Sequence, residues 1–119
     1  MLLVDDDRAV RRSITLLLRA RGYKVHDFGS AAELLGAQVC ESSHCLITDY
    51  LMPSMDGLVL LERLRAGGWT GCAALITGCY QKDLEKRALE AGFLALIEKP
   101  LTDEKLVDLI ALHLGKPLL

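Results

Sequence analysis

The sequence has no excess of positive charge and no long apolar run. Lysine and arginine total 14 against 16 aspartate and glutamate residues, which gives a net charge of −2. Without a basic surplus, the composition gives no support to direct nucleic-acid binding. No apolar stretch approaches the roughly 20 residues of a transmembrane helix. No signal peptide is visible, because the first apolar run is short and meets three aspartates. We therefore expect a cytoplasmic protein with no membrane partner.

The four cysteines form no C-x-x-C pair. His44 stands beside Cys45 with Cys40 nearby, which could suggest a soft-metal site, but the spacing is wrong for a standard zinc module. Cysteines of a cytoplasmic protein are expected as reduced thiols. Small buried hydrophobic residues are the better interpretation of Cys45 and Cys72.

The chain also lacks linkers, internal repeats and low-complexity segments. Its 119 residues are enough for one domain with one core. The composition, 51% hydrophobic and 25% charged, is that of an ordinary globular protein rather than a disordered one. We expect a single domain over residues 1–119.

Short apolar runs alternate with helical patterns along the whole chain. The apolar runs, which predict buried strands, cover residues 2–4, 23–28, 44–48, 72–76 and 94–97. The helical patterns cover residues 7–21, 57–66 and 82–91. A further helix begins at the capping-box sequence Ser30-x-x-Glu33, and a last one, capped by Thr102, runs to about His113. Strict alternation predicts an α/β fold, with a parallel sheet, helices on both faces and one of a few doubly wound strand orders.

Polar residues of a particular kind follow the predicted strands. Asp5 and Asp6 follow the first strand, Asp49 the third, Thr77 the fourth and Lys99 the fifth. Because the carboxyl ends of parallel strands share one edge, we expect these side chains to converge. Clustered carboxylates repel one another and need a cation, and their hard oxygens favour Mg²⁺. The alternative for the acidic triplet is a solvated turn that begins a helix, where aspartate is favoured by the helix dipole.

The individual residues also have ordinary structural interpretations. Thr77 could simply end a strand, Lys99 could be a solvated surface charge, and Asp56 could only cap a helix. Asp49, between an apolar strand and a proline-containing loop, has no obvious structural use. It is therefore the strongest candidate for a reactive group.

The first predicted helix carries arginines at positions 8, 11, 12 and 19. Its apolar residues form a separate face, made by Val10, Ile14, Leu17 and Leu18. We expect the arginines to form a solvated face, with Arg8 and Arg12 close enough to the site to contact a partner.

Four motifs in order give the chain a family resemblance: LVDDD at the first strand, ITDYLMPSMDG after the third, LITG at the fourth and IEKP at the fifth. The chain resembles the receiver domain of bacterial two-component response regulators, the CheY-like group, along almost its whole length. The resemblance implies a flavodoxin-like, five-stranded parallel sheet of order 2-1-3-4-5 with five helices.

The resemblance also implies a bound Mg²⁺ ion, for which Mn²⁺ can substitute. Asp6 and Asp49 would hold the ion together with the backbone carbonyl of Leu51. Asp5 would bind it directly or through water. The ion would neutralise the negative charge that otherwise keeps a carboxylate from attacking a phosphoryl group.

In the same family pattern, Asp49 would be the phosphoacceptor and would form an aspartyl phosphate. Lys99 would pair with one phosphoryl oxygen as a compact point charge, and Thr77 would donate its hydroxyl to another. The peptide bond before Pro100 is often cis in the family.

One position departs from the usual family residue, and two others are expected to affect how fast the phosphoryl group is lost. Leu96 replaces the tyrosine or phenylalanine that takes part in the family's switch together with Thr77. We therefore expect the loop from Thr77 to Gln81 to carry more of the conformational change. Leu51 and Cys79, each two residues after a site residue, are neither acidic nor amides, which predicts slow autodephosphorylation.

The resemblance implies a signalling phosphoacceptor rather than an enzyme that turns over a separate substrate. The phosphoryl donor would be a histidine kinase or phosphotransfer protein. The phosphorylated domain would then act on a downstream output domain or protein. The responding surface would be formed by the fourth helix, the fifth strand and the fifth helix. That surface also mediates homodimers in the family.

Three other functions are compatible with parts of the sequence. A phosphatase of the haloacid-dehalogenase kind needs D-x-D-G-T at the first strand, but Arg8-Ala9 follow Asp7 here. A flavin- or nucleotide-binding domain needs an anion-binding loop there, and three aspartates would repel phosphate. A phosphorylation-independent interaction module stays open as the alternative.

Overall fold

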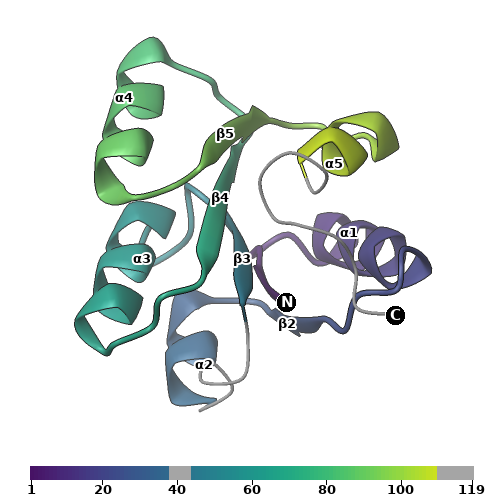
Figure 1. The fold of residues 1–119 in the computed structure, drawn as a ribbon, viewed down its shortest axis with the longest axis horizontal. Helices are drawn as coiled ribbons and strands as arrows, with labels where there is room; N and C mark the ends of the chain where they lie inside the picture. The colour runs from purple at the N-terminus through teal and green to yellow at the C-terminus, as the bar shows by residue number, and fades with distance from the viewer. Residues whose placement is uncertain (38–43, 110–119) are drawn as a thin grey trace.

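The computed structural model describes residues 1–37 and 44–109, whose arrangement is shown in Figure 1. The strands are β1 (Leu2–Val4), β2 (His26–Phe28), β3 (Cys45–Asp49), β4 (Cys72–Thr77) and β5 (Ala95–Glu98). The helices are α1 (Arg8–Ala20), α2 (Ala31–Gly36), α3 (Gly57–Ala66), α4 (Lys82–Ala91) and α5 (Asp103–Leu109). The predicted alternation of strands and helices is confirmed.

The strands form one parallel sheet in the order β2-β1-β3-β4-β5. This confirms the predicted doubly wound, flavodoxin-like fold. The register pairs Val4 with Thr48, and Asp49 with Ile76. The central strands therefore end at nearly the same level, so the residues that follow them meet at one edge.

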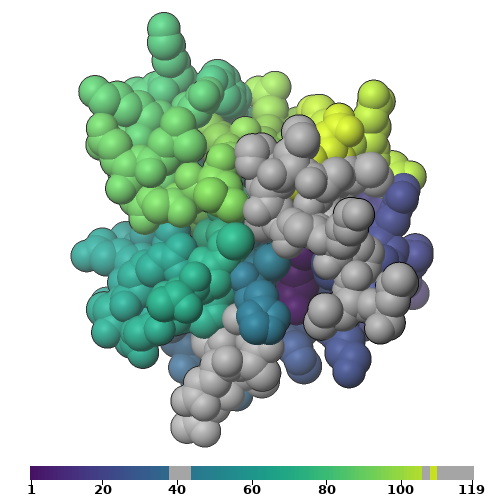
Figure 2. All heavy atoms as spheres, in the orientation of Figure 1, coloured from purple at the N-terminus to yellow at the C-terminus, as the bar shows by residue number. Residues whose placement is uncertain are grey.

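Helices cover both faces of the sheet. Figure 1 shows α2, α3 and α4 on one side and α1 and α5 on the other. Along β1 the side chains alternate between the two layers: Leu2 and Val4 pack with α2, α3 and α4, whereas Leu3 packs with α1 and α5. In the space-filling view, α3 and α4 form one continuous surface on the left of the molecule (Figure 2).

Several strand boundaries differ from the predictions. β2 begins at His26 rather than at residue 23, because the N–H of Tyr23 donates to Leu18 O and completes the end of α1. β5 is shifted by one residue toward the carboxyl end. β3 and β4 each run one residue further than predicted, through Asp49 and Thr77. These two candidate residues are thus part of the sheet rather than of the loops that follow it.

The helix boundaries follow from their caps. α3 and α4 have the predicted bounds, with Asp56 capping α3 through Val59 N–H and Gly92 ending α4 at φ 106°. α1 begins one residue later than predicted, because Asp7 is its N-cap. The predicted end of the last helix near residue 113 lies outside the described residues.

The core confirms the interpretation of two cysteines. Cys45 is buried and Cys72 is half-buried, both in the apolar layer beneath α1 and α5. Cys40 lies outside the described residues. Within residues 1–37 and 44–109, no helix has the length and apolarity needed to cross a membrane.

Candidate functional site

Three carboxylates meet at the carboxyl edge of the sheet. Asp5 and Asp6 follow β1, and Asp49 is the last residue of β3. One oxygen from each lies within 4.8 Å of the others. Asp5 is 0% exposed and Asp49 only 5%, whereas Asp6 faces solvent. The convergence predicted from the strand ends is present, with two buried carboxylates and one at the surface.

Lys99, directly after β5, reaches into this cluster. Its Nζ lies 3.1 Å from Asp5 Oδ2 and 3.1 Å from Asp49 Oδ2. Its backbone N–H donates to Thr77 O at 2.7 Å, and the peptide bond to Pro100 is cis, as the resemblance implied. Lys99 is therefore an internal partner of the carboxylates rather than a solvated surface charge.

The electrostatics of the cluster favour a bound cation. Burial raises the pKa of Asp49 to about 6; the hydrogen bond from Lys99 opposes this rise, and the charge of Asp5 adds to it. Burial lowers the pKa of Lys99, but its hydrogen bond to Asp49 and the nearby carboxylate charges outweigh burial and raise it. One ammonium thus faces three carboxylates, so negative charge is in excess.

The donor set suits a small divalent cation. Mg²⁺ prefers carboxylate oxygens at 2.0–2.1 Å in an octahedral shell and usually keeps several waters. Oxygens on opposite sides of such an ion are about 4.2 Å apart. The carboxylate oxygens of the cluster already lie within 4.8 Å of one another, and exposed Asp6 has room to adjust. The residues present therefore fit Mg²⁺.

Thr77 is buried at the end of β4, on the strand beside Asp49. The residue is 1% exposed, and its Oγ1 accepts a hydrogen bond from the N–H of Cys79 at 3.1 Å. Cys79 itself is exposed in the loop between β4 and α4. The hydroxyl therefore links the sheet edge to that loop.

The loop between β3 and α3 is fixed on both sides of the site. Tyr50 donates its N–H to Ile76 O at 2.9 Å and accepts from Gly57 N–H at 2.9 Å. A Cβ at Gly57 would stand 2.5 Å from Asp49 O, so only glycine allows α3 to begin there. Leu51 is 63% exposed beside the cluster, and its carbonyl as a metal ligand stays a prediction.

Arg11 also belongs to the site, although the sequence predicted a solvated arginine. Its Nη1 donates to Asp5 O at 2.8 Å, and its Nε pairs with Asp27 Oδ2 at 3.2 Å. Arg11 lies on the helical face of the buried residues Ile14 and Leu18, three and seven positions further on. That spacing was the signal that could have identified it.

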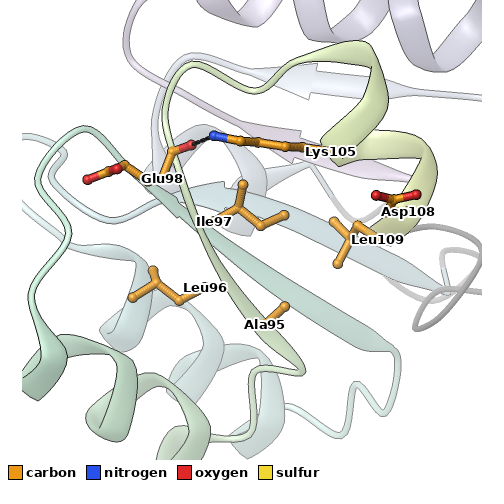
Figure 3. A pocket seen from close by; sticks show the side chains of 7 residues that line it. All are labelled: Ala95, Leu96, Ile97, Glu98, Lys105, Asp108 and Leu109. Carbon is orange, nitrogen blue, oxygen red and sulfur yellow. Dashed lines mark hydrogen bonds between the residues drawn. The ribbon is translucent and has the colours of Figure 1, made fainter.

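A groove of about 340 Å³ lies between β5 and α5 (Figure 3). Its described lining residues are Ala95, Leu96, Ile97, Glu98, Lys105, Asp108 and Leu109. Lys105 Nζ donates to Glu98 O at 3.2 Å across one end. The described lining of the groove includes Leu96, the candidate switch residue, but not Asp5, Asp6 or Asp49.

A family model and curated relatives both match this chain over most of its length. The family model described as "Response regulator receiver domain" matches residues 1–111. The transcriptional regulatory protein FixJ of Azorhizobium caulinodans is 35% identical over 113 residues, which are 95% of this chain and 54% of FixJ. The C4-dicarboxylate transport transcriptional regulatory protein DctR of Rhodobacter capsulatus is 32% identical over 120 residues, which cover 96% of this chain and 61% of DctR.

A solved structure adds the same result for the fold. The crystal structure of a response regulator receiver domain protein from Clostridium thermocellum superimposes with a TM-score of 0.83 at 26% identity. The match covers 92% of this chain and 89% of that one. Against the curated relatives the chain is shorter, spanning 54% of FixJ.

Proposed function

Because the chain belongs to the response regulator receiver family, we propose that residues 1–119 form a receiver domain that accepts a phosphoryl group on Asp49. The observation that carries the proposal is the meeting of Asp49 with Asp5, Asp6 and Lys99 at one sheet edge. Asp49 is the buried carboxylate on the central strand β3, with an ammonium 3.1 Å away. The domain acts as a signalling phosphoacceptor that assists only its own phosphorylation and dephosphorylation.

The donor is a histidine kinase or phosphotransfer protein that carries a phosphohistidine. A carboxylate oxygen of Asp49 attacks phosphorus, the new P–O bond forms, and the P–N bond breaks with its electron pair returning to the imidazole. The attack needs the ionised carboxylate, which a pKa of about 6 supplies at neutral pH. Lys99 then pairs with a phosphoryl oxygen, and Thr77 turns its hydroxyl to another.

Asp6, Asp49 and the backbone carbonyl of Leu51 would hold Mg²⁺, for which Mn²⁺ can substitute. When bound, the ion would neutralise negative charge on the phosphoryl oxygens. Asp5 Oδ1 accepts from Asp7 N–H at 2.9 Å, and its Oδ2 is paired with Lys99. Asp5 would therefore contact the ion through water, or directly if Lys99 left its carboxylate.

Phosphorylation is read out at the surface of α4, β5 and α5. Thr77 and Leu96 are the switch residues, and the loop from Thr77 to Gln81 carries most of the change, since Leu96 has no hydroxyl and less area to relocate. The changed surface contacts a downstream output domain or protein and supports a homodimer. The names of FixJ and DctR, both transcriptional regulatory proteins, support an output of this kind. The receiver itself works in the cytoplasm without binding nucleic acid.

The acyl phosphate can be located chemically. Borohydride reduces an aspartyl phosphate to homoserine, so we incubate the protein with acetyl phosphate and MgCl₂, reduce it, and map its peptides by mass spectrometry. The proposal expects homoserine at position 49, and only when Mg²⁺ is present. Homoserine at another aspartate, or at none, would overturn it.

A further inference from the structure

Arg11 joins three elements around the carboxyl end of β1. From α1 its Nη1 donates to Asp5 O at 2.8 Å, while its Nε pairs with Asp27 of β2 at 3.2 Å. The side chain is only 19% exposed. A Cβ at Gly29, just after β2, would stand 3.0 Å from Arg11 Nη1, so the chain leaves room for the guanidinium at this point.

The backbone N–H, the carbonyl and the carboxylate of Asp5 each contact another residue. Its N–H donates to Phe28 O at 3.2 Å, and its carbonyl accepts from Arg11. Its carboxylate accepts from the N–H of Asp7 and pairs with Lys99. Among these contacts, the one from Arg11 is made to the peptide group that links Asp5 to the next residue.

That peptide group carries Asp6, the exposed member of the cluster. A peptide unit is planar, so fixing the carbonyl oxygen of Asp5 also fixes the direction in which the N and Cα of Asp6 leave it. A charged donor forms a stronger and shorter hydrogen bond than a neutral one. Arg11 thereby fixes the backbone position from which the Asp6 side chain extends, while the carboxylate at the end of that side chain can still rotate.

We infer that Arg11, held in place by Asp27, is a positioning residue that makes the acidic cluster selective for a small cation over a larger one. Mg²⁺ demands near-ideal octahedral geometry at 2.0–2.1 Å, whereas Ca²⁺ accepts six to eight oxygens at 2.3–2.6 Å in flexible arrangements. A displaced Asp6 therefore weakens Mg²⁺ binding more than Ca²⁺ binding. The inference rests on the cation site of the proposed function.

Simple electrostatics predicts a different outcome, which makes the inference testable. Removing a positive charge beside the cluster should strengthen the binding of both cations to a similar extent, because both carry the same charge. Loss of positioning should instead weaken Mg²⁺ binding and leave Ca²⁺ binding nearly unchanged. The ratio of the two dissociation constants separates the two causes.

The test compares Arg11→Met with the wild-type chain at fixed ionic strength. MgCl₂ and CaCl₂ are titrated separately, and each dissociation constant is taken from the rise in melting temperature with cation concentration. Mutation of a residue that orients a metal ligand typically lowers metal affinity by 10- to 100-fold. We expect a loss of about 10-fold in Mg²⁺ affinity, with Ca²⁺ affinity within about 3-fold of wild type.

Two further variants complete the design. Arg12→Met removes an exposed charge from the same helix and is expected to keep the wild-type Mg²⁺-to-Ca²⁺ ratio. Asp27→Ala removes the ion-pair partner of Arg11 and is expected to raise the ratio of the Mg²⁺ to the Ca²⁺ dissociation constant, as Arg11→Met does. If circular dichroism shows that Arg11→Met does not fold, Asp27→Ala alone tests whether Arg11 is a positioning residue.

The outcomes separate this inference from the proposed function. If the wild type binds Mg²⁺ and both Arg11→Met and Asp27→Ala keep its ratio, the positioning role is overturned while the cation site stands. If the wild-type melting temperature does not respond to Mg²⁺, the cation site and the inference both fail.

Discussion

At the scale of single residues, the site concentrates negative charge where the fold removes water. Asp5 and Asp49 are buried, and among residues 1–37 and 44–109 the ammonium that pairs with both is that of Lys99. Burial disfavours the ionised carboxylate, and a second carboxylate nearby disfavours it further. The residues are thus arranged at a cost to stability that a bound cation would offset. The substitution Asp49→Asn tests this cost.

Asp49→Asn should stabilise the cation-depleted protein at pH 7.5. The pKa of Asp49 is about 6 in the fold against an ordinary 3.8, so the folded state holds the proton more tightly. Stability therefore falls as pH rises from about 4 through 6, and a neutral side chain removes that loss. We expect a gain on the order of 2 kcal/mol at pH 7.5 that disappears at pH 3.5, measured by urea unfolding in EDTA.

The matched control is Asp56→Asn, at the N-cap of α3. Asparagine caps helices about as well as aspartate, so little change is expected at either pH. An Asp49→Asn protein no more stable than wild type at pH 7.5 would show that Lys99 fully compensates the buried charge.

Gly57→Ala should destabilise the protein and disturb the site. The added Cβ would meet Asp49 O at 2.5 Å and Leu75 Cδ1 at 2.6 Å. Such overpacking typically costs about 1–3 kcal/mol. Gly36→Ala serves as the control, because no atom of the described part of the chain lies within 4 Å of its added Cβ and alanine favours the helix. Urea unfolding should show a clear loss for the first variant and none for the second; equal effects would contradict the close approach.

At the scale of elements, the loop between β4 and α4 is the part best placed to respond to phosphorylation. Thr77 Oγ1 accepts from the N–H of Cys79, so a hydroxyl that turns toward a phosphoryl group leaves this amide without its acceptor. Leu96, in register with Leu75 on β4, packs against the core instead. The loop and β5 are therefore expected to respond differently.

Amide hydrogen exchange can distinguish the two elements. On phosphorylation, the Cys79 amide should exchange at least about threefold faster, while the amides around Leu96 change less. Thr77→Val, which lacks the hydroxyl, should abolish the response in the loop. No change between Thr77 and Gln81 would refute the loop-centred switch.

Much of this architecture was predictable from local sequence signals, and the exceptions have physical causes. α3 and α4 were predicted to the residue because Asp56 and Gly92 mark their ends chemically. The convergence of Asp49 and Lys99 followed from the rule that parallel strands end at one edge. For Arg11, the helical spacing from Ile14 and Leu18 indicates a buried face, but its ion pair with Asp27 joins distant parts of the chain and cannot be read from periodicity.

At the scale of the whole molecule, apolar side chains remain exposed near the proposed output surface. Leu89 on α4 is 52% exposed and Leu94, just before β5, is 41% exposed. Exposed apolar residues that lie close together on a folded surface often mark a contact site. The net charge of −2 leaves little repulsion between two copies of the chain.

Phosphorylation should therefore shift the protein toward a dimer through this surface. Size-exclusion chromatography with light scattering should show an increased mass after acetyl phosphate and Mg²⁺ treatment, and Leu89→Glu should keep the phosphorylated protein monomeric. Leu16→Glu, a 58% exposed leucine on α1, is the control and should leave the mass increase intact. A Leu89→Glu protein that still dimerises would place the interface elsewhere.

The most direct test of the central claim is the intact mass of the protein after incubation with acetyl phosphate, with and without Mg²⁺, for wild type and Asp49→Ala. We expect an added mass of one phosphoryl group, about 80 Da, in wild type with Mg²⁺ and in neither control. An adduct that persists in Asp49→Ala would contradict the role of Asp49. No adduct in wild type, from acetyl phosphate or from kinase donors, would favour a phosphorylation-independent interaction module instead.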